Sequence, residues 1–563
     1  MKNILFTLTA LFLALSTSSQ ISFTTLPKSN QLYPRDPATG QATPVISGTV
    51  NFAGTPYDKI YLKLYRNNIF QNSYSQPLSY SQGVANFSLS FPIAAELANY
   101  KIKIYATTGG NLTLVTSVDS IVAGDAFIIT GQSNAAAGAV YGFANDDNKN
   151  SFIRVYGSGS ISGYTPEWFE ANGDIWDGGG DGNCGQWGLR LAKDLLDEYN
   201  IPVAIFNGAN SGQPISWFQR NDANPQDQNT NYGRLLRRVT ETSFLNNIRA
   251  VFWYQGESNS FGTTTISYKN SFNDLNNDWV DDYPGYEHLY IIQIKQGCGA
   301  GKTGVSKIQE AHRELAAEIS NASVYATNGT NQASDKCHYG YKTGYKVTGD
   351  NLYRIINRDL YGGPDAANIE SPYVISAVQS APSQITLYFK NTGDAYYWTN
   401  GTEKDFKLEG STVTVIIGTV SGSSVILTLS ATPVSFTGLS YLGHQGPGSP
   451  TIRNSNDLGL VSFRLFPVTP FSPKLGVQSE PAVSFYPNPA TEETTLRFQL
   501  IEQTEVTISI YESSGRKVLE KNTGNINEGW HTQTINLSEL SQGLYMIALQ
   551  MGNNIIRKQL IIE

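Results

Sequence analysis

The stretch Ala126–Asn134, AFIITGQSN, joins five residues typical of a buried β-strand to a polar turn that begins with a glycine. Similar apolar segments recur along the chain, each followed by a longer segment with helical spacing. They are VAIF (203–206), AVFWY (250–254), LYIIQI (289–294) and SVYA (323–326). Because these strands lack polar alternation and alternate with helices, they predict an α/β fold: a parallel sheet covered by helices on both faces.

The helices of this α/β region are expected at 185–199, 231–245, 268–279, 305–319 and 342–358. In the first of them Leu189, Ala192 and Leu196 recur at spacings of three and four residues. This spacing places them in one apolar stripe along the helix. The stripe is expected to pack against the sheet.

The rest of the chain has short alternating runs separated by glycine, proline and asparagine, which is typical of antiparallel strands. We therefore expect β-rich modules on both sides of the α/β domain. The predicted parts are a signal peptide (1–20), an N-terminal β-sandwich (21–123), the α/β domain (124–363), a β-rich domain (364–466), a proline-rich linker (467–481) and a C-terminal β-domain (482–563). The signal peptide is predicted from Lys2, a twelve-residue apolar run and a small-residue exit.

Composition excludes several kinds of protein. The 563 residues carry a net charge of -8 without any block of lysine and arginine, which argues against a nucleic-acid partner. The apolar run near the start is too short to cross a bilayer, which needs about 20 residues, and no later segment comes close, so no transmembrane segment is expected. The three cysteines lack the CxxC spacing of zinc or redox sites, and we expect no metal and no cofactor.

Four polar clusters follow directly after predicted strands. They are GQSN (131–134), NGANSGQ (207–213), WYQGESN (253–259) and DKCH (335–338). The carboxyl ends of parallel strands open on one edge of a sheet, so these clusters should converge. Together they offer what acyl transfer requires: Ser133 as the nucleophile, His338 as the base, and Asp335 to orient the imidazole.

The other histidines are weaker candidates for the base. His444 and His531 fall in the later β modules, and His288 precedes its strand at the wrong end of the sheet. His312 shares a helical stripe with Ile308 and Leu315, which favours a packed structural role. His338 remains as the base.

Three of these blocks resemble the sialate O-acetylesterase family of carbohydrate esterases, a branch of the SGNH hydrolases. The similarity lies in IVAGDAFIITGQSN (121–134), AVFWYQGESN (250–259) and the DxxH of SDKCHYGYKTG (334–344), with LYPRD (32–36) ahead of them. The resemblance implies an SGNH-type α/β/α sandwich and the same triad of Ser133, His338 and Asp335. It implies a carbohydrate O-acetylesterase that removes acetyl groups from glycans, and an acetylated carbohydrate as the substrate.

The oxyanion should be held by the backbone N–H groups of Ser133 and Gly212 and by the Gln255 carboxamide. Gly212 is chosen because it stands, with Ser211, where the family usually has two adjacent glycines. Gln255 is a neutral donor at a strand end, and the alternatives are Asn259 as the donor or a purely structural Gln255. Glu257 would be ionised and would repel an oxyanion, so we expect it to be a structural carboxylate. Tryptophans in nearby loops could bind the sugar by stacking: Trp168, Trp176 and Trp217.

Cys298 and Cys337 should both reach the edge of the sheet that carries the site, which predicts a disulfide, with Cys184 as a rival partner. The last 80 residues resemble the C-terminal sorting domain of the type IX secretion system of Bacteroidetes, through YPNP (486–489) and LSQGLYMIAL (540–549). This resemblance implies export by that machinery to the cell surface or the medium. Two other functions stay open: a short-chain lipid or thioester hydrolase of the same superfamily, and a non-catalytic carbohydrate-binding protein.

Overall fold

The computed structural model describes residues 20–52, 56–158, 164–175, 180–471, 483–500, 502–512, 514–552 and 554–563. The chain divides into two compact units, Met1–Phe471 and Ser472–Glu563. Almost all of the predicted signal peptide and most of the predicted linker lie outside the described residues. The predicted domain boundaries therefore stay a proposal.

A sheet of seven neighbouring strands lies at the centre of the first unit. Six of them are parallel, and one edge strand is antiparallel. The strand order is β12-β11-β13-β10-β14-β15-β16, and only β12 runs antiparallel to its neighbour. The strands are β10 (Asn111–Gly131), β11 (Ile153–Tyr156), β12 (Trp168–Glu170), β13 (Val203–Asn207), β14 (Ile248–Tyr254), β15 (His288–Gln293) and β16 (Ala322–Ala326). The five strands β10, β13, β14, β15 and β16 thus present their carboxyl ends at one edge of the sheet.

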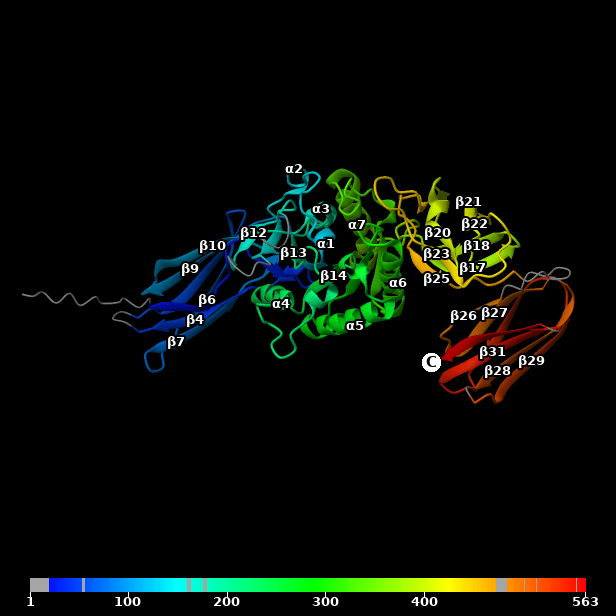
Figure 1. Ribbon diagram of the computed structural model, residues 1–563. Helices are drawn as coiled ribbons and strands as arrows, with labels where there is room; N and C mark the ends of the chain where they lie inside the picture. The colour runs from blue at the N-terminus through cyan, green and yellow to red at the C-terminus, as the bar shows by residue number, and fades with distance from the viewer. Residues whose placement is uncertain are drawn as a thin grey trace, which may run out of the picture. The chain divides into compact units, whose positions relative to one another are not determined.

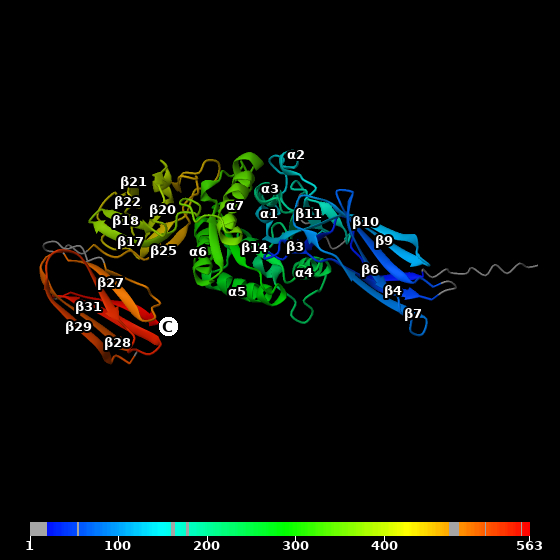
Figure 2. The same cartoon turned by 180° about the vertical axis from the view of Figure 1, so that it is seen from behind.

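Helices cover both faces of this sheet, as the sequence predicts (Figure 1). The helices α3 (Gln186–Tyr199) and α7 (Lys346–Tyr361) pack against each other on one face. The opposite face is covered by α4 (Asn231–Glu241), α5 (Thr265–Asp282) and α6 (Lys302–Glu318), as the view from behind also shows (Figure 2). The predicted stripe of α3 is buried against the sheet, because Leu189, Ala192 and Leu196 belong to the same hydrophobic core as its strands.

The N-terminal part is a sandwich of two antiparallel sheets. One contains β1 (Ile21–Thr25), β4 (Val45–Asn51) and β7 (Val84–Ser90), and the other contains β6 (Ile69–Pro77), β5 (Lys59–Arg66), β9 (Tyr100–Thr108) and the first half of β10. The second half of β10 pairs in parallel with β13 and β14. One strand therefore carries the chain from the sandwich into the α/β sheet, across the predicted boundary at residue 123.

The segment LYPRD is attached at the same place. Its strand β2 (Leu32–Pro34) pairs in parallel with Val122–Gly124 of β10. The Arg35 guanidinium binds the buried Asp125 carboxylate through two nitrogens, at 2.8 and 2.9 Å. Such bidentate pairs fix geometry as well as charge, so LYPRD secures the start of the half of β10 that pairs with β13 and β14.

The remaining sheets are antiparallel. Residues after α7 form β17 (Val374–Ala381), β18 (Gln384–Phe389), β22 (Ser424–Leu429) and β21 (Val415–Ser421), with further short strands up to Phe466. The second unit is itself built from two sheets. Its strands are β26 (Val483–Tyr486), β27 (Glu493–Leu500) and β30 (Gly529–Asn536), and then β29 (Lys517–Ile526), β28 (Thr504–Glu512), β31 (Gly543–Met551) and β32 (Asn554–Ile562).

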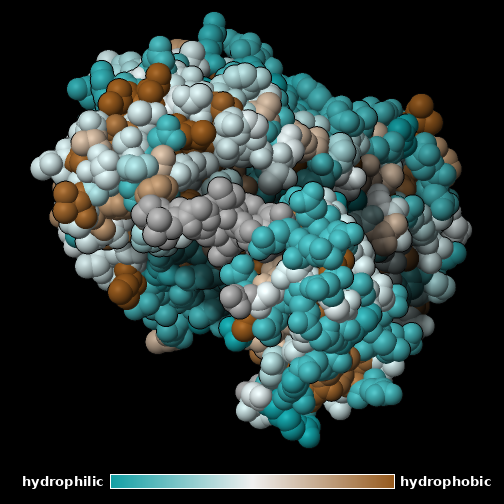
Figure 3. Space-filling model, turned by 90° about the vertical axis from the view of Figure 1, so that its right-hand side faces the viewer, coloured by the Kyte–Doolittle hydropathy of each residue, from teal (hydrophilic) through white to brown (hydrophobic). Residues whose placement is uncertain are grey.

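The visible surface mixes hydrophilic and hydrophobic residues. On the face shown in Figure 3, hydrophobic residues are scattered in small groups among hydrophilic ones. In the described parts of the chain, no helix has both the length and the apolar character needed to cross a membrane.

Candidate active site

Ser133 lies at the carboxyl end of β10, as the first residue of the short helix α1 (Ser133–Ala136). The turn depends on Gly131, whose φ of +133° favours glycine. A Cβ added there would lie 2.1 Å from the carbonyl oxygen of Tyr254 on the neighbouring strand. Glycine thus lets β10 and β14 approach closely, and the chain then turns Ser133 into a helix start whose N–H has no partner within the helix.

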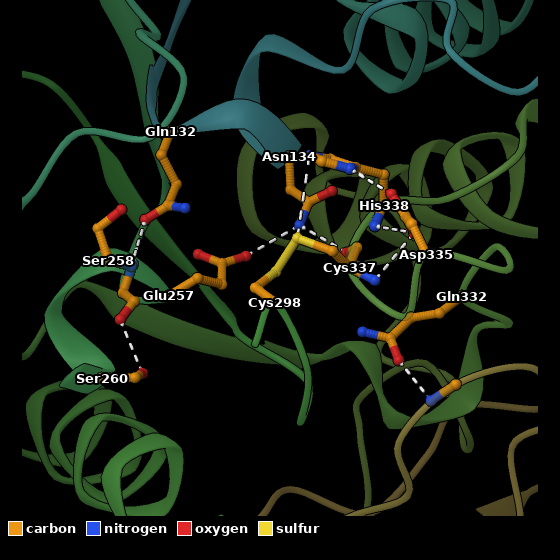
Figure 4. The surroundings of a disulfide bond; sticks show 12 residues. Gln132, Asn134, Glu257, Ser258, Ser260, Cys298, Gln332, Asp335, Cys337 and His338 are labelled. Carbon is orange, nitrogen blue, oxygen red and sulfur yellow. Dashed lines mark hydrogen bonds and ion pairs between the residues drawn. A yellow bond between two sulfur atoms is a disulfide. The ribbon is translucent and has the colours of Figure 1, made fainter. Parts of the chain in front are cut away.

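His338 and Asp335 form the predicted pair. The Asp335 Oδ2 atom lies 2.7 Å from His338 Nδ1, and Oδ1 accepts the backbone N–H groups of Cys337 and His338 at 3.0 Å each (Figure 4). Partial burial would raise the pKa of Asp335, but the hydrogen bonds from His338 and the two amides outweigh it and lower the pKa below 3.8. An ionised Asp335 holds the ring so that Nε2 is the nitrogen that can accept a proton.

Asn134 joins the turn after β10 to the loop that carries this pair. Its Nδ2 donates to the Cys337 carbonyl at 3.2 Å and to Glu257 Oε1 at 2.9 Å, and its Oδ1 accepts from the Tyr345 hydroxyl. The residue next to Ser133 is therefore bonded to the residue next to His338, although 203 positions separate the two. The first, third and fourth polar clusters meet here, as the predicted sheet required (Figure 4).

The second cluster reaches the same edge. The backbone N–H of Asn210 donates to the Gly131 carbonyl at 2.8 Å, and Gly212 follows in a turn with φ of +72°. No backbone acceptor is bonded to the N–H of Ser133 or of Gly212 within the described residues. Both amides can thus serve as donors to a developing negative charge.

Gln255 lies in a network that uses its carboxamide. Its Nε2 has three acceptors within 3.2 Å, which are Gln132 Oε1, the Gln213 carbonyl and Asn259 Oδ1. The Tyr268 hydroxyl donates to its Oε1 at 2.8 Å. The alternative donor Asn259 is also engaged, because its Nδ2 donates to Thr263 and its Oδ1 also accepts the Ile215 N–H. Gln255 therefore ties three clusters together, and it could bind an oxyanion only by exchanging one of its present acceptors.

Glu257 is buried beneath this arrangement. Its Oε1 accepts from Asn134, whereas its Oε2 has no protein partner among the described residues. Burial raises the pKa of Glu257 above 4.5, and the hydrogen bond from Asn134 only partly offsets this. Its contact with an N–H group agrees with the structural role that the sequence suggests.

The buried carboxyl predicts a pH-dependent effect of Glu257→Gln. Above pH 4.5 the unfolded chain loses this proton while the folded chain retains it, so wild-type stability falls until the pH passes the folded pKa. The variant has no such proton to lose and can still accept from Asn134. We expect its melting temperature to rise relative to wild type as the pH increases from 4 to 8, measured by thermal unfolding. A flat or falling difference for Glu257→Gln would contradict the prediction.

The predicted disulfide is present. Cys298 and Cys337 are bonded, with their Cα atoms 4.4 Å apart (Figure 4). Cys184 is free and buried. Cys298 lies in the loop after β15, and its N–H also donates to the Lys336 carbonyl at 3.0 Å. The bridge therefore fixes the loop that holds Asp335 and His338 to the loop that follows β15.

Removing this bridge should destabilise the first unit. A disulfide that links residues 39 positions apart is worth about 4 kcal/mol when it constrains the unfolded chain. We expect the double variant Cys298→Ser/Cys337→Ser to lose about this much on urea unfolding and to lose activity together with loop order. A reductant should lower the stability of wild type but not of the variant. Unfolding free energies that agree within about 1 kcal/mol would contradict the prediction.

The structure treats the three predicted sugar-binding tryptophans differently. Trp168 is only 4% exposed and its ring packs against Tyr156, Phe206 and Phe244, so we withdraw it from the sugar-binding residues. Trp217 is 42% exposed and stays a candidate. Trp176 lies outside the described residues. Trp168 was misassigned because β12, the edge strand that buries it, was not predicted.

The histidines agree with their predicted positions. His312 is fully buried, contacts the Tyr268 hydroxyl through Nε2, and burial lowers its pKa to about 3. His288 begins β15, at the opposite edge of the sheet from the site, and contacts Ser323. His444 lies near Asp405, outside the polar clusters.

The sequence did not indicate Tyr141, which follows α1 in a loop of exposed apolar residues. Tyr141 is 40% exposed. The pKa of its hydroxyl is raised, mainly by desolvation and next by the negative charge of Asp335. A Cβ added to Gly340, two residues after His338, would lie 3.2 Å from the Tyr141 carbonyl. Tyr141 therefore borders the His338 loop. The exposed Val140 and Tyr141, which lie between Gly138 and Gly142, were the signal that could have found it.

Residues 123–355 match the model of a family described as carbohydrate esterase, sialic acid-specific acetylesterase. The matched residues include all four polar clusters. Residues 484–563 match the model of a secretion system C-terminal sorting domain. No curated protein sequence matches the chain.

Solved structures also resemble the chain. A carbohydrate acetylesterase from Xanthomonas citri is 15% identical, covering 79% of this chain and 99% of its own, with a TM-score of 0.54. A protein from Arabidopsis thaliana is 22% identical (41% and 97% covered, TM-score 0.33), and NanS is 14% identical (36% and 77% covered, TM-score 0.28). At 15% identity the first likeness shows a shared fold over 79% of this chain and nothing more, and the others are too distant to add to it.

Proposed function

We propose that the protein is a secreted or surface-held carbohydrate O-acetylesterase of the SGNH type, with Ser133, His338 and Asp335 as its catalytic triad. The observation that carries the proposal is the hydrogen bond between Asn134 and the Cys337 carbonyl, which joins the neighbours of the nucleophile and the base. The 2.7 Å contact between His338 and Asp335 supports the role of each. A protein that only binds sugar has no need for this pair.

The proposed reaction has two steps. Nε2 of His338 removes the proton from Ser133 Oγ while Oγ bonds to the acetyl carbonyl carbon, whose oxygen takes the electron pair. The N–H groups of Ser133 and Gly212 donate to this oxyanion, and Gln255 is the proposed third donor. His338 then gives its proton to the sugar oxygen as the ester bond breaks. Water repeats the sequence, releasing acetate and restoring Ser133.

The C-terminal sorting domain supports export of the esterase. We propose that type IX secretion machinery carries the chain across the outer membrane and that this domain is then removed, leaving the enzyme outside the cell or on its surface. Comparing the intact mass of the secreted protein with the encoded mass tests the removal.

Acyl-chain preference separates a carbohydrate acetylesterase from a lipid hydrolase. The polar clusters that contain Ser133 and Gln255 are rich in amide side chains, including Gln132, Asn134 and Gln255, so a long alkyl chain would gain little by burial against them. We expect kcat/KM for p-nitrophenyl acetate to exceed that for p-nitrophenyl octanoate at least about tenfold. Equal or reversed values would favour a lipid or thioester hydrolase.

The substrate itself is tested by release of acetate from acetylated polysaccharides. Xylan, pectin and sialylated glycans would be compared, with Ser133→Ala as the blank. Activity on p-nitrophenyl acetate without acetate release from any glycan would contradict the carbohydrate assignment while leaving the triad intact.

A further inference from the structure

The outward face of the sheet β6-β5-β9-β10 carries a regular set of tyrosines and lysines. Alternate residues of β5 and β9 point into the sandwich core, such as Leu62 and Ile104. Their neighbours point outward, and the strand register places Tyr61 opposite Tyr105 and Lys63 opposite Lys103. Because directly opposed residues share a face, these four side chains lie side by side.

Tyr65 extends this set along β5, and apolar side chains flank it on the outer strands. Phe70 of β6 is opposite Tyr65 and is 52% exposed, and Leu114 of β10 is opposite Tyr105 and is 54% exposed. We call Tyr61, Lys63, Tyr65, Lys103, Tyr105, Phe70 and Leu114 the Tyr–Lys face. Figure 1 shows its strands β6, β9 and β10 in the sandwich.

The tyrosines of this face do not belong to the core. They are half-buried, and none is part of the hydrophobic cluster that fills the described sandwich. Instead they contact ammonium groups: Lys63 Nζ lies 5.4 Å from the Tyr105 ring centre and 6.0 Å from that of Tyr61, and Lys103 Nζ lies 5.5 Å from that of Tyr65. Aromatic rings and positive charges are thus interleaved over one surface.

The charge of the face is opposite to that of the protein. The outward positions of β5 and β9 carry Lys59, Lys63, Lys101 and Lys103. Lys101 pairs with Asp119 at 2.7 Å, whereas no ion pair of the other three lysines is found among the described residues. On a chain with a net charge of -8, this local excess of positive charge favours an anionic partner.

We propose that the Tyr–Lys face is a binding site for an acidic polysaccharide, separate from the catalytic site. The apolar face of a sugar ring can lie against an aromatic side chain, and the carboxylates of uronic or sialic acid units can pair with ammonium groups. An acidic glycan offers both chemistries along one chain. Such a site would hold the esterase on a charged polymer whichever ester it hydrolyses.

The test measures binding of the full-length Ser133→Ala protein to polygalacturonate that bears no acetyl groups. The result therefore does not depend on esterase activity. Affinity electrophoresis should show retardation by polygalacturonate but not by neutral dextran. The double variant Tyr61→Ala/Tyr105→Ala should weaken binding at least about tenfold. The double variant Lys63→Gln/Lys103→Gln should weaken it similarly and should reduce its dependence on salt.

Matched controls are Tyr388→Ala, at an exposed tyrosine of β18, and Lys404→Gln, at an exposed lysine. Both should bind like the parent, and thermal unfolding should show that all variants fold. Three results would overturn the proposal: no retardation by polygalacturonate, equal retardation of the parent and both face variants, or binding to phosphatidylglycerol vesicles without binding to the polymer.

Discussion

Ser133→Ala should abolish release of p-nitrophenol from p-nitrophenyl acetate, with kcat falling by about 10⁴-fold or more. In the proposed mechanism this hydroxyl forms the bond to the acyl group, and no other step can begin without it. The side chain is small and 6% exposed at the start of α1, so its loss should leave the fold intact. Ester hydrolysis and thermal unfolding would be measured on the same preparation.

Ser258→Ala is the matched control, because it removes a hydroxyl from the third polar cluster. The Ser258 backbone N–H, which donates to Gln132, is kept in this variant. It should retain activity within about twofold of wild type. A folded Ser133→Ala protein with more than about 1% of wild-type activity would contradict the assignment of the nucleophile.

His338→Gln should cause a loss of similar size, about 10⁴-fold or more in kcat, because glutamine can neither remove the proton from Ser133 nor return it to the sugar oxygen. Asp335→Asn should lower kcat by no more than His338→Gln does. The substitution disturbs the orientation and tautomer of the His338 ring but leaves the base in place. Initial rates over a range of pH would be compared for both variants.

His288→Gln is the control for His338→Gln. It changes a histidine at the opposite edge of the same sheet and should leave kcat within about twofold. If His288→Gln lost activity as fully as His338→Gln, while both variants unfolded at the wild-type temperature, His338 could not be assigned as the base.

The α/β core could be predicted from sequence because its strands are apolar without interruption and its helices keep one apolar stripe. AFIIT, for example, became the buried end of β10, and the α3 stripe is buried as expected. Helix ends were predicted less well. The helix α4 ends at Glu241 and is capped by Thr242, four residues before the predicted end at residue 245. Local signals mark where an element is, but its last turn depends on tertiary contacts.

Within the site, the convergence of the clusters was predictable because it follows from the sheet topology alone. The bridge between Cys298 and Cys337 was predictable for the same reason. Each cysteine lies in a loop after a strand, and the two strands end at the same edge of the sheet. The hydrogen-bond network of Gln255 was not, because three of its partners come from segments 4, 42 and 123 positions away. Which atoms a buried amide meets is decided by packing, and no local pattern encodes it.

The central claim is that Ser133 Oγ is the nucleophile of an acyl-enzyme. A fluorophosphonate probe forms a stable covalent bond with an activated serine, and peptide mass mapping locates it. The account predicts one adduct, on the peptide that contains Ser133, absent in Ser133→Ala and strongly reduced in His338→Gln. An adduct on any other serine of a protein inhibited by the probe would contradict it.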